Sequence, residues 1–134
     1  MNSENRIASF YSNIGNILYS VAACDKVVQK EEILNVRKLL QKDWLIAEKS
    51  LKDLEEDSAQ KIQNYFYSLL EQSPDPQECF NEFKAFYESN KDMFSKTIND
   101  WIINTTSAIA FSFSKNNKSE LVMLSKIQIL LTQK

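Results

Sequence analysis

The 134-residue sequence predicts an all-α domain of about six or seven helices. The chain has one glycine and two prolines, so few positions interrupt a helix. Apolar residues recur at steps of three and four, which is the spacing of one helix face. No segment shows the sustained alternation of a half-buried strand. With 43% hydrophobic and 25% charged residues, a single domain over residues 1–134 is expected to bury one core.

The first predicted helix has Ser3 as its N-cap and Gly15 in its middle, where a missing side chain favours close packing. A polar break follows, and a second helix is expected from about Lys30. A short third helix is expected near Leu51 and Leu54. The apolar face of the first helix comprises Ile7, Phe10, Tyr11, Ile14, Ile17, Leu18, Val21 and Ala22, and that of the second comprises Ile33, Val36, Leu39 and Leu40.

The second half of the chain predicts four more helical segments. Asp75 is placed as an N-cap, Pro76 at the first helical position, and Glu78 to complete a capping box. The next helix is expected from about Met93 to Phe113. The inward residues of the four segments are expected to be Ile62, Tyr65, Phe66, Leu69 and Leu70, then Phe80, Phe83, Phe86 and Tyr87, then Phe94, Ile98, Trp101, Ile102, Ala108 and Ile109, and, from about Lys118, Leu121, Leu124, Ile127 and Leu131. The aromatic residues among them fit a core, with a binding groove as the alternative.

The composition excludes most catalytic motifs. The chain has no histidine, so it has no catalytic triad, no Cys–His pair and no histidine zinc site. One glycine is too few for a phosphate-binding loop or a dinucleotide fingerprint. We therefore expect a protein that is not an enzyme.

Charge and cysteine usage favour a cytoplasmic protein that does not bind nucleic acid. The net charge is −2, and only two of the sixteen basic residues are arginines. Residues 43–92 carry five basic and twelve acidic residues, a surface that either attracts a cationic partner or is only solvated. Cys24 and Cys79 lie far apart among apolar neighbours, as expected of two buried free thiols. No secretory signal or membrane span is recognised.

Residues 18–34 and 106–122 repeat a pattern. Each describes a helix ending in small residues, a short polar turn, and a new helix with Glu32 or Glu120 in its first turn. The match predicts a pseudo-duplicated helical hairpin, with chance similarity as the alternative.

The first copy resembles the TerB-like (tellurite-resistance) domain family, which includes a module of a membrane-anchored DnaJ-like co-chaperone. The resemblance lies in a helix that ends in small residues and Asp25, followed by a short turn and Glu32. It covers residues 14–40 and, more weakly, residues 101–131. It implies a compact helical module with a role in tellurite or general stress response. The departures are Lys26 where the family has Gly, Gln29 where Ser or Thr is usual, and Phe113 at the position of the second Asp.

The resemblance also implies a divalent cation at the first turn. Asp25, Glu31 and Glu32 are the candidate ligands, and carboxylates suit Ca²⁺, Mg²⁺ or Mn²⁺. A structural role fits the same residues, because Glu32 stands three residues after Gln29, as in a capping box.

The alternative function is a protein-interaction adaptor without a metal. Its candidate contacts are Trp44, in a polar connection, and an acidic cluster of Asp53, Glu55, Glu56 and Asp57. Trp44 also fits the core, and the acidic cluster also fits a solvated helix end. In both interpretations we expect a protein partner.

Overall fold

The protein is all-helical in the part of the chain that the structure, a computed structural model, describes: residues 3–24, 38, 44, 58–113 and 118–132. These residues form five α-helices and one 3-10 turn, and no strand. The helices expected from Lys30 and near Leu51 lie outside the described residues. The elements are α1 (Ser3–Ala22), α4 (Ser58–Gln72), α5 (Pro76–Ser89), η1 (Lys91–Met93), α6 (Lys96–Phe113) and α7 (Lys118–Thr132).

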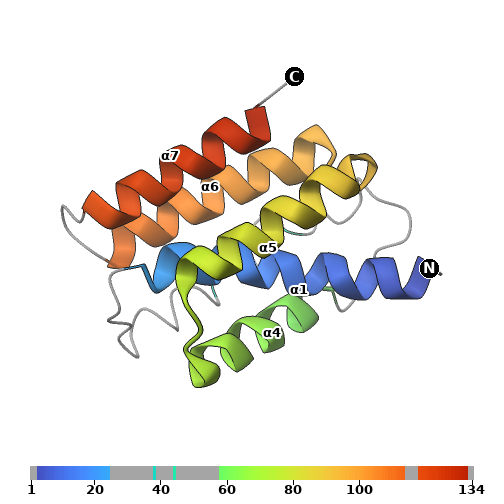
Figure 1. Cartoon of the computed structure of the whole chain (residues 1–134), viewed down its shortest axis with the longest axis horizontal. Coiled ribbons are helices and arrows are strands. Elements are labelled where there is room, and N and C mark those ends of the chain that lie inside the picture. The colour runs from blue at the N-terminus through green and yellow to red at the C-terminus, as the bar shows by residue number, and fades with distance from the viewer. Residues whose placement is uncertain (1–2, 25–37, 39–43, 45–57, 114–117, 133–134) are drawn as a thin grey trace.

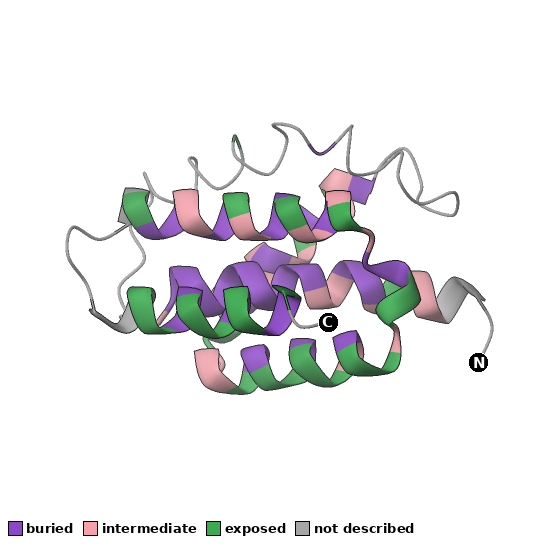
Figure 2. Ribbon diagram, turned by 90° about the horizontal axis from the view of Figure 1, so that it is seen from above, coloured by how far each residue is buried: buried purple, intermediate pink, exposed green. Residues whose placement is uncertain are grey.

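Helix α1 is the centre of the packing. It contacts α4, α5, α6 and α7, whereas α7 lies beside α6 and runs in the opposite direction (Figure 1). The faces that point inward are buried, and the outer turns of the helices are exposed (Figure 2). This arrangement confirms the apolar stripe predicted for α1, in which Phe10, Ile14, Ile17, Leu18 and Val21 are completely buried.

Gly15 allows α1 and α4 to approach closely. A Cβ atom at this position would lie 2.7 Å from Cδ1 of Tyr65 on α4, closer than carbon atoms can pack. The prediction that Gly15 serves close packing is therefore confirmed.

An aromatic cluster joins α1, α5 and the connection between η1 and α6. Its centre is Phe94, whose ring centroid lies 5.3 Å from Phe10, 5.6 Å from Phe83 and 5.0 Å from Tyr87. The pairs with Phe83 and Tyr87 are edge-to-face, and such pairs contribute about 0.5–1.5 kcal/mol beyond the area that they bury. The interpretation of these aromatic residues as core is confirmed.

The starts of α5 and α6 differ in detail from the prediction. Asp75 caps α5, with its Oδ1 accepting from Gln77 N at 3.1 Å, and Pro76 is the first helical residue. Glu78 is exposed and makes no hydrogen bond back to the cap among the described residues. Helix α6 begins at Lys96, not Met93, because Ser95 Oγ accepts from Ile98 N at 3.2 Å.

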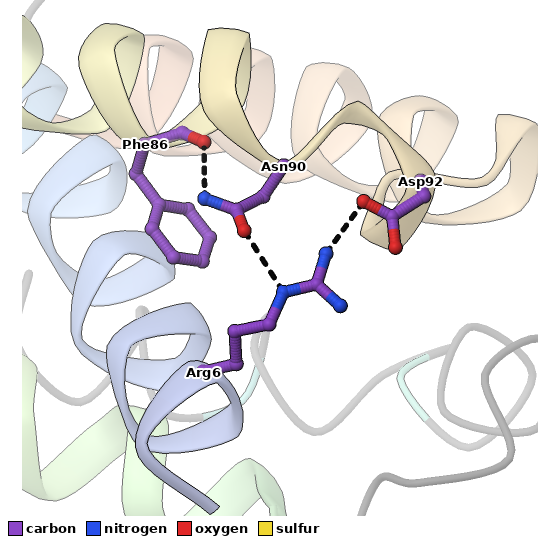
Figure 3. A network of polar contacts seen from close by, with 4 residues as sticks. All are labelled: Arg6, Phe86, Asn90 and Asp92. Carbon is purple, nitrogen blue, oxygen red and sulfur yellow. Dashed lines mark hydrogen bonds and ion pairs between the residues drawn. The ribbon is translucent and has the colours of Figure 1, made fainter. Parts of the chain in front are cut away.

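Polar contacts tie α1 to the segments on either side of α5. Arg6 donates from Nε to Asn90 Oδ1 at 2.9 Å and from Nη2 to Asp92 at 2.5 Å, and Asn90 in turn donates to the carbonyl of Phe86 (Figure 3). At the other end of α5, Tyr19 donates its hydroxyl to the carbonyl of Pro74 at 2.8 Å. These contacts fix both ends of α5 relative to α1.

Candidate functional site

Most of the residues predicted as metal ligands or interaction sites lie outside the described residues. They are Asp25, Glu31 and Glu32 of the metal hypothesis, and Asp53, Glu55, Glu56 and Asp57 of the acidic cluster. Within the described part of the chain, no group of three or more Cys, Asp or Glu side chains is placed to hold a metal ion. The hypotheses about these seven residues stay predictions.

Trp44 lies in the core and not on a contact surface. Its side chain is 1% exposed. The indole Nε1 donates to Ser58 Oγ at 2.6 Å, and the ring meets Trp101 edge-on with centroids 4.5 Å apart. The buried indole thus has both an aromatic neighbour and a hydrogen-bond acceptor, which is how Trp is accommodated in a core.

Neither cysteine forms a disulfide, and only one of the two thiols is fully buried. Cys79 is buried on α5, whereas Cys24 is half-buried, which corrects the expectation that both would be buried. Burial, together with the nearby Glu82, raises the pKa of the Cys79 thiol to about 11. Cys79 is therefore a protonated, unreactive thiol at neutral pH.

Helix α7 presents apolar side chains to solvent. Leu121 is 54% exposed, Val122 55% and Ile129 62%. Leu121 was expected to face inward, and that expectation is wrong. The inward positions are taken by Met123, Leu124, Ile127, Leu130 and Leu131. Large aliphatic residues thus occupy both faces of α7, a pattern typical of a helix with neighbours on more than one side.

A groove of about 360 Å³ lies between α5 and α7. Helix α5 contributes residues at positions i, i+3, i+4 and i+7, which share one face of the helix. Helix α7 contributes residues at positions i, i+3 and i+4. The lining residues are Gln77, Phe80, Asn81 and Lys84 from α5 and Lys126, Ile129 and Leu130 from α7.

Hydrogen bonds order the polar side chains of this groove. Lys126 donates from Nζ to Gln77 Oε1 at 2.8 Å, and Gln77 donates from Nε2 to Asn81 Oδ1 at 3.0 Å. The Lys126 ammonium also lies 6.0 Å from the centroid of the Phe80 ring, at the outer limit of a cation–π contact. Two lysines and no acidic residue line the groove, so the charged side chains of its lining are all positive.

Of the seven groove residues, only Phe80 was a candidate from the sequence, as one of the aromatic residues for which a binding groove was the alternative to a core. The polar positions 77, 81 and 84 resemble an ordinary solvated helix face. The sequence feature that indicates an exposed apolar surface is in α7, which has more apolar residues than one inward face can hold. In the described part of the chain, every helix is too short or too polar to span a lipid bilayer.

Comparisons with protein-family models, with curated proteins and with solved structures find no match to this chain.

Proposed function

We propose that the chain is a non-enzymatic protein-binding module and that the outer face of α7 is its recognition surface. The observation that supports this is the exposure of Leu121, Val122 and Ile129 on one helix. Positions 122 and 129 are seven residues apart, about 10 Å or two turns along the helix, and so lie on the same side, with position 121 on the adjoining part of this face. Burying an exposed aliphatic side chain contributes about 1.5–3 kcal/mol, so a partner that covers all three gains substantially.

The rest of this face suits a protein partner. Ser125, Gln128 and Thr132 are also exposed and lie between or beyond the aliphatic residues. Small polar side chains beside aliphatic ones are typical of interfaces that form and dissociate, in which an apolar centre has a polar rim. Phe111, near the end of α6, is 79% exposed and adds a further apolar residue.

Site-specific photo-crosslinking in the native host tests this proposal. A benzoylphenylalanine at Val122 is expected to give a discrete protein adduct, because a partner covers this position. The same residue at Glu71, exposed on α4, is the matched control and is expected to give none. The Val122 adduct should weaken at least several-fold in the Leu121→Ser, Ile129→Ser double variant. Equal adducts from Val122 and Glu71, or an adduct insensitive to the double variant, would contradict the proposal.

The TerB-like interpretation, with divalent-metal binding at the Asp25 turn, is a second proposal. It is supported by the order of the elements, since α1 ends at Ala22 just before Asp25 and α7 starts at Lys118 after a short connection. Millimolar Ca²⁺ or Mn²⁺ is expected to raise the Tm of the wild type and not that of Asp25→Ala, because the variant lacks a ligand. An equal response of both proteins, or of neither, would count against the metal site.

A further inference from the structure

We infer that the groove between α5 and α7 binds an acidic amphipathic segment of a protein partner, with a carboxylate held by Lys84 and Lys126 and apolar side chains packed on Phe80 and Ile129. This inference rests on the proposed function and specifies the chemistry of the partner. The outer face of α7 and the groove share Ile129, so one partner can cover both.

Charge complementarity identifies the partner as acidic. Lys84 and Lys126 line the groove, and neither forms an ion pair with any described residue. The other lining residues are neutral. Because nothing in the lining neutralises these two ammonium groups, a carboxylate is favoured there and a cationic segment is disfavoured.

The geometry of Lys126 keeps its charge available for a ligand. Its ammonium group uses one donor on Gln77 Oε1, at 2.8 Å, and an ammonium group carries three. Gln77 is itself held by its bond to Asn81, so the lysine head is anchored at the groove. A carboxylate can accept a hydrogen bond from one of the remaining N–H groups without displacing Gln77. Because the lysine head is already held, its side chain loses less conformational entropy on binding than an unanchored lysine would.

The shape and lining favour a peptide over a lipid chain. The α5 residues from 77 to 84 extend about 10 Å, or two helical turns, which matches the reach of an i, i+3, i+4, i+7 set on a partner helix. Four of the seven lining residues are polar, namely Gln77, Asn81, Lys84 and Lys126. Beyond the bonds that they make to one another, their amides and ammonium groups have further donors and acceptors, which the polar edge of a peptide can match and an acyl chain cannot.

A random peptide library displayed on phage, selected against the whole chain, tests the inference. The selected peptides are expected to carry Asp or Glu within one helical turn of Leu, Ile or Phe. The affinity of a synthesised peptide from this pool should fall at least about tenfold for Lys126→Glu, because an attraction becomes a repulsion. Lys96→Glu is the matched control, since Lys96 is an exposed lysine on α6 outside the groove. The affinity of this variant for the peptide should stay within about twofold of that of the wild type.

The other outcomes separate the inference from the proposed function. Peptides that lack acidic residues and bind Lys126→Glu normally, but lose affinity for Ile129→Ser, would overturn the inference and leave the proposed function standing. No enrichment over an uncoated surface would contradict both the inference and the proposed function.

Two further experiments test other occupants of the surface. Sedimentation equilibrium that shows a dimer disrupted by Ile129→Ser would assign the surface to a second copy of the chain and overturn the inference. Binding to phosphatidylglycerol vesicles that Lys126→Glu abolishes would also overturn the inference, because it would assign the groove to a lipid surface. Circular dichroism checks that each variant is folded.

Discussion

At the scale of single residues, the ion pair between Arg6 and Asp92 makes the stability of the fold depend on pH. The guanidinium lies 2.5 Å from the carboxylate, while Asn90 holds its Nε. The hydrogen bond from Arg6 lowers the pKa of Asp92 below its ordinary value. A group whose pKa is lower in the folded protein stabilises it above the pKa of the unfolded chain, and this contribution is lost as the pH falls through the folded value.

We expect Asp92→Asn to lower the urea midpoint slightly at pH 7 and to have a smaller effect at pH 2, because protonation of the wild-type carboxyl weakens the ion pair as the pH falls. Urea titrations at both values measure the difference. Asp100→Asn is the control, because Asp100 pairs with Lys96 at 3.5 Å between two well-exposed side chains, where an ion pair contributes little. If the urea midpoints of wild type and Asp92→Asn differed as much at pH 2 as at pH 7, the ion pair would be excluded as the cause of the difference.

At the scale of elements, the end of α4 shows how the chain manages with one glycine. Ser73 follows the last helical residue and has φ 53°, in the left-handed region that glycine occupies most readily. Its N–H donates to the carbonyl of Leu69 at 2.8 Å, the bond that closes such a helix end. Pro74 follows directly and prevents the helix from continuing.

Ser73→Gly is expected to stabilise the protein by about 0.5–1 kcal/mol. The steric strain of a Cβ atom in this conformation exceeds the free energy of the backbone entropy that glycine loses on folding. Chemical denaturation measures the free energy of unfolding. Ser73→Ala keeps the Cβ and loses the bond from Oγ to the Leu70 carbonyl, so it should give no gain. If the two variants had equal stability, backbone strain would not be the reason.

At the scale of the whole molecule, periodicity predicts the helices well and their contacts poorly. The stripes of α1, α4 and α5 follow directly from residues such as Phe10, Phe66 and Phe83, because each helix has one face to bury. Leu121 was misplaced, since α7 carries apolar residues on both faces and periodicity cannot choose between them.

The candidate site could not be predicted for a related reason. The groove joins Gln77 and Lys126, which are 49 residues apart, and it exists only because α7 lies beside α5. Local patterns determine which face of each helix is apolar, but not which neighbour covers it. The residues that the sequence did single out, such as Asp25 and Asp53, were chosen by motif and by charge, and neither property depends on tertiary contacts.

The buried amide of Asn16 restricts how the helices can pair. Asn16 is 2% exposed, and its Nδ2 donates to Asn13 Oδ1 at 3.1 Å and to Glu82 Oε2 at 3.2 Å, while its Oδ1 has no partner among the described residues. If α1 slid by one turn along α5, the amide would keep its bond to Asn13 and lose Glu82, so one of its two N–H donors would be left buried without an acceptor. Apolar contacts restrict such a shift less, because the hydrophobic effect is non-directional. The cost of a single polar residue thus selects one alignment of the two helices among several that hydrophobic packing alone would allow.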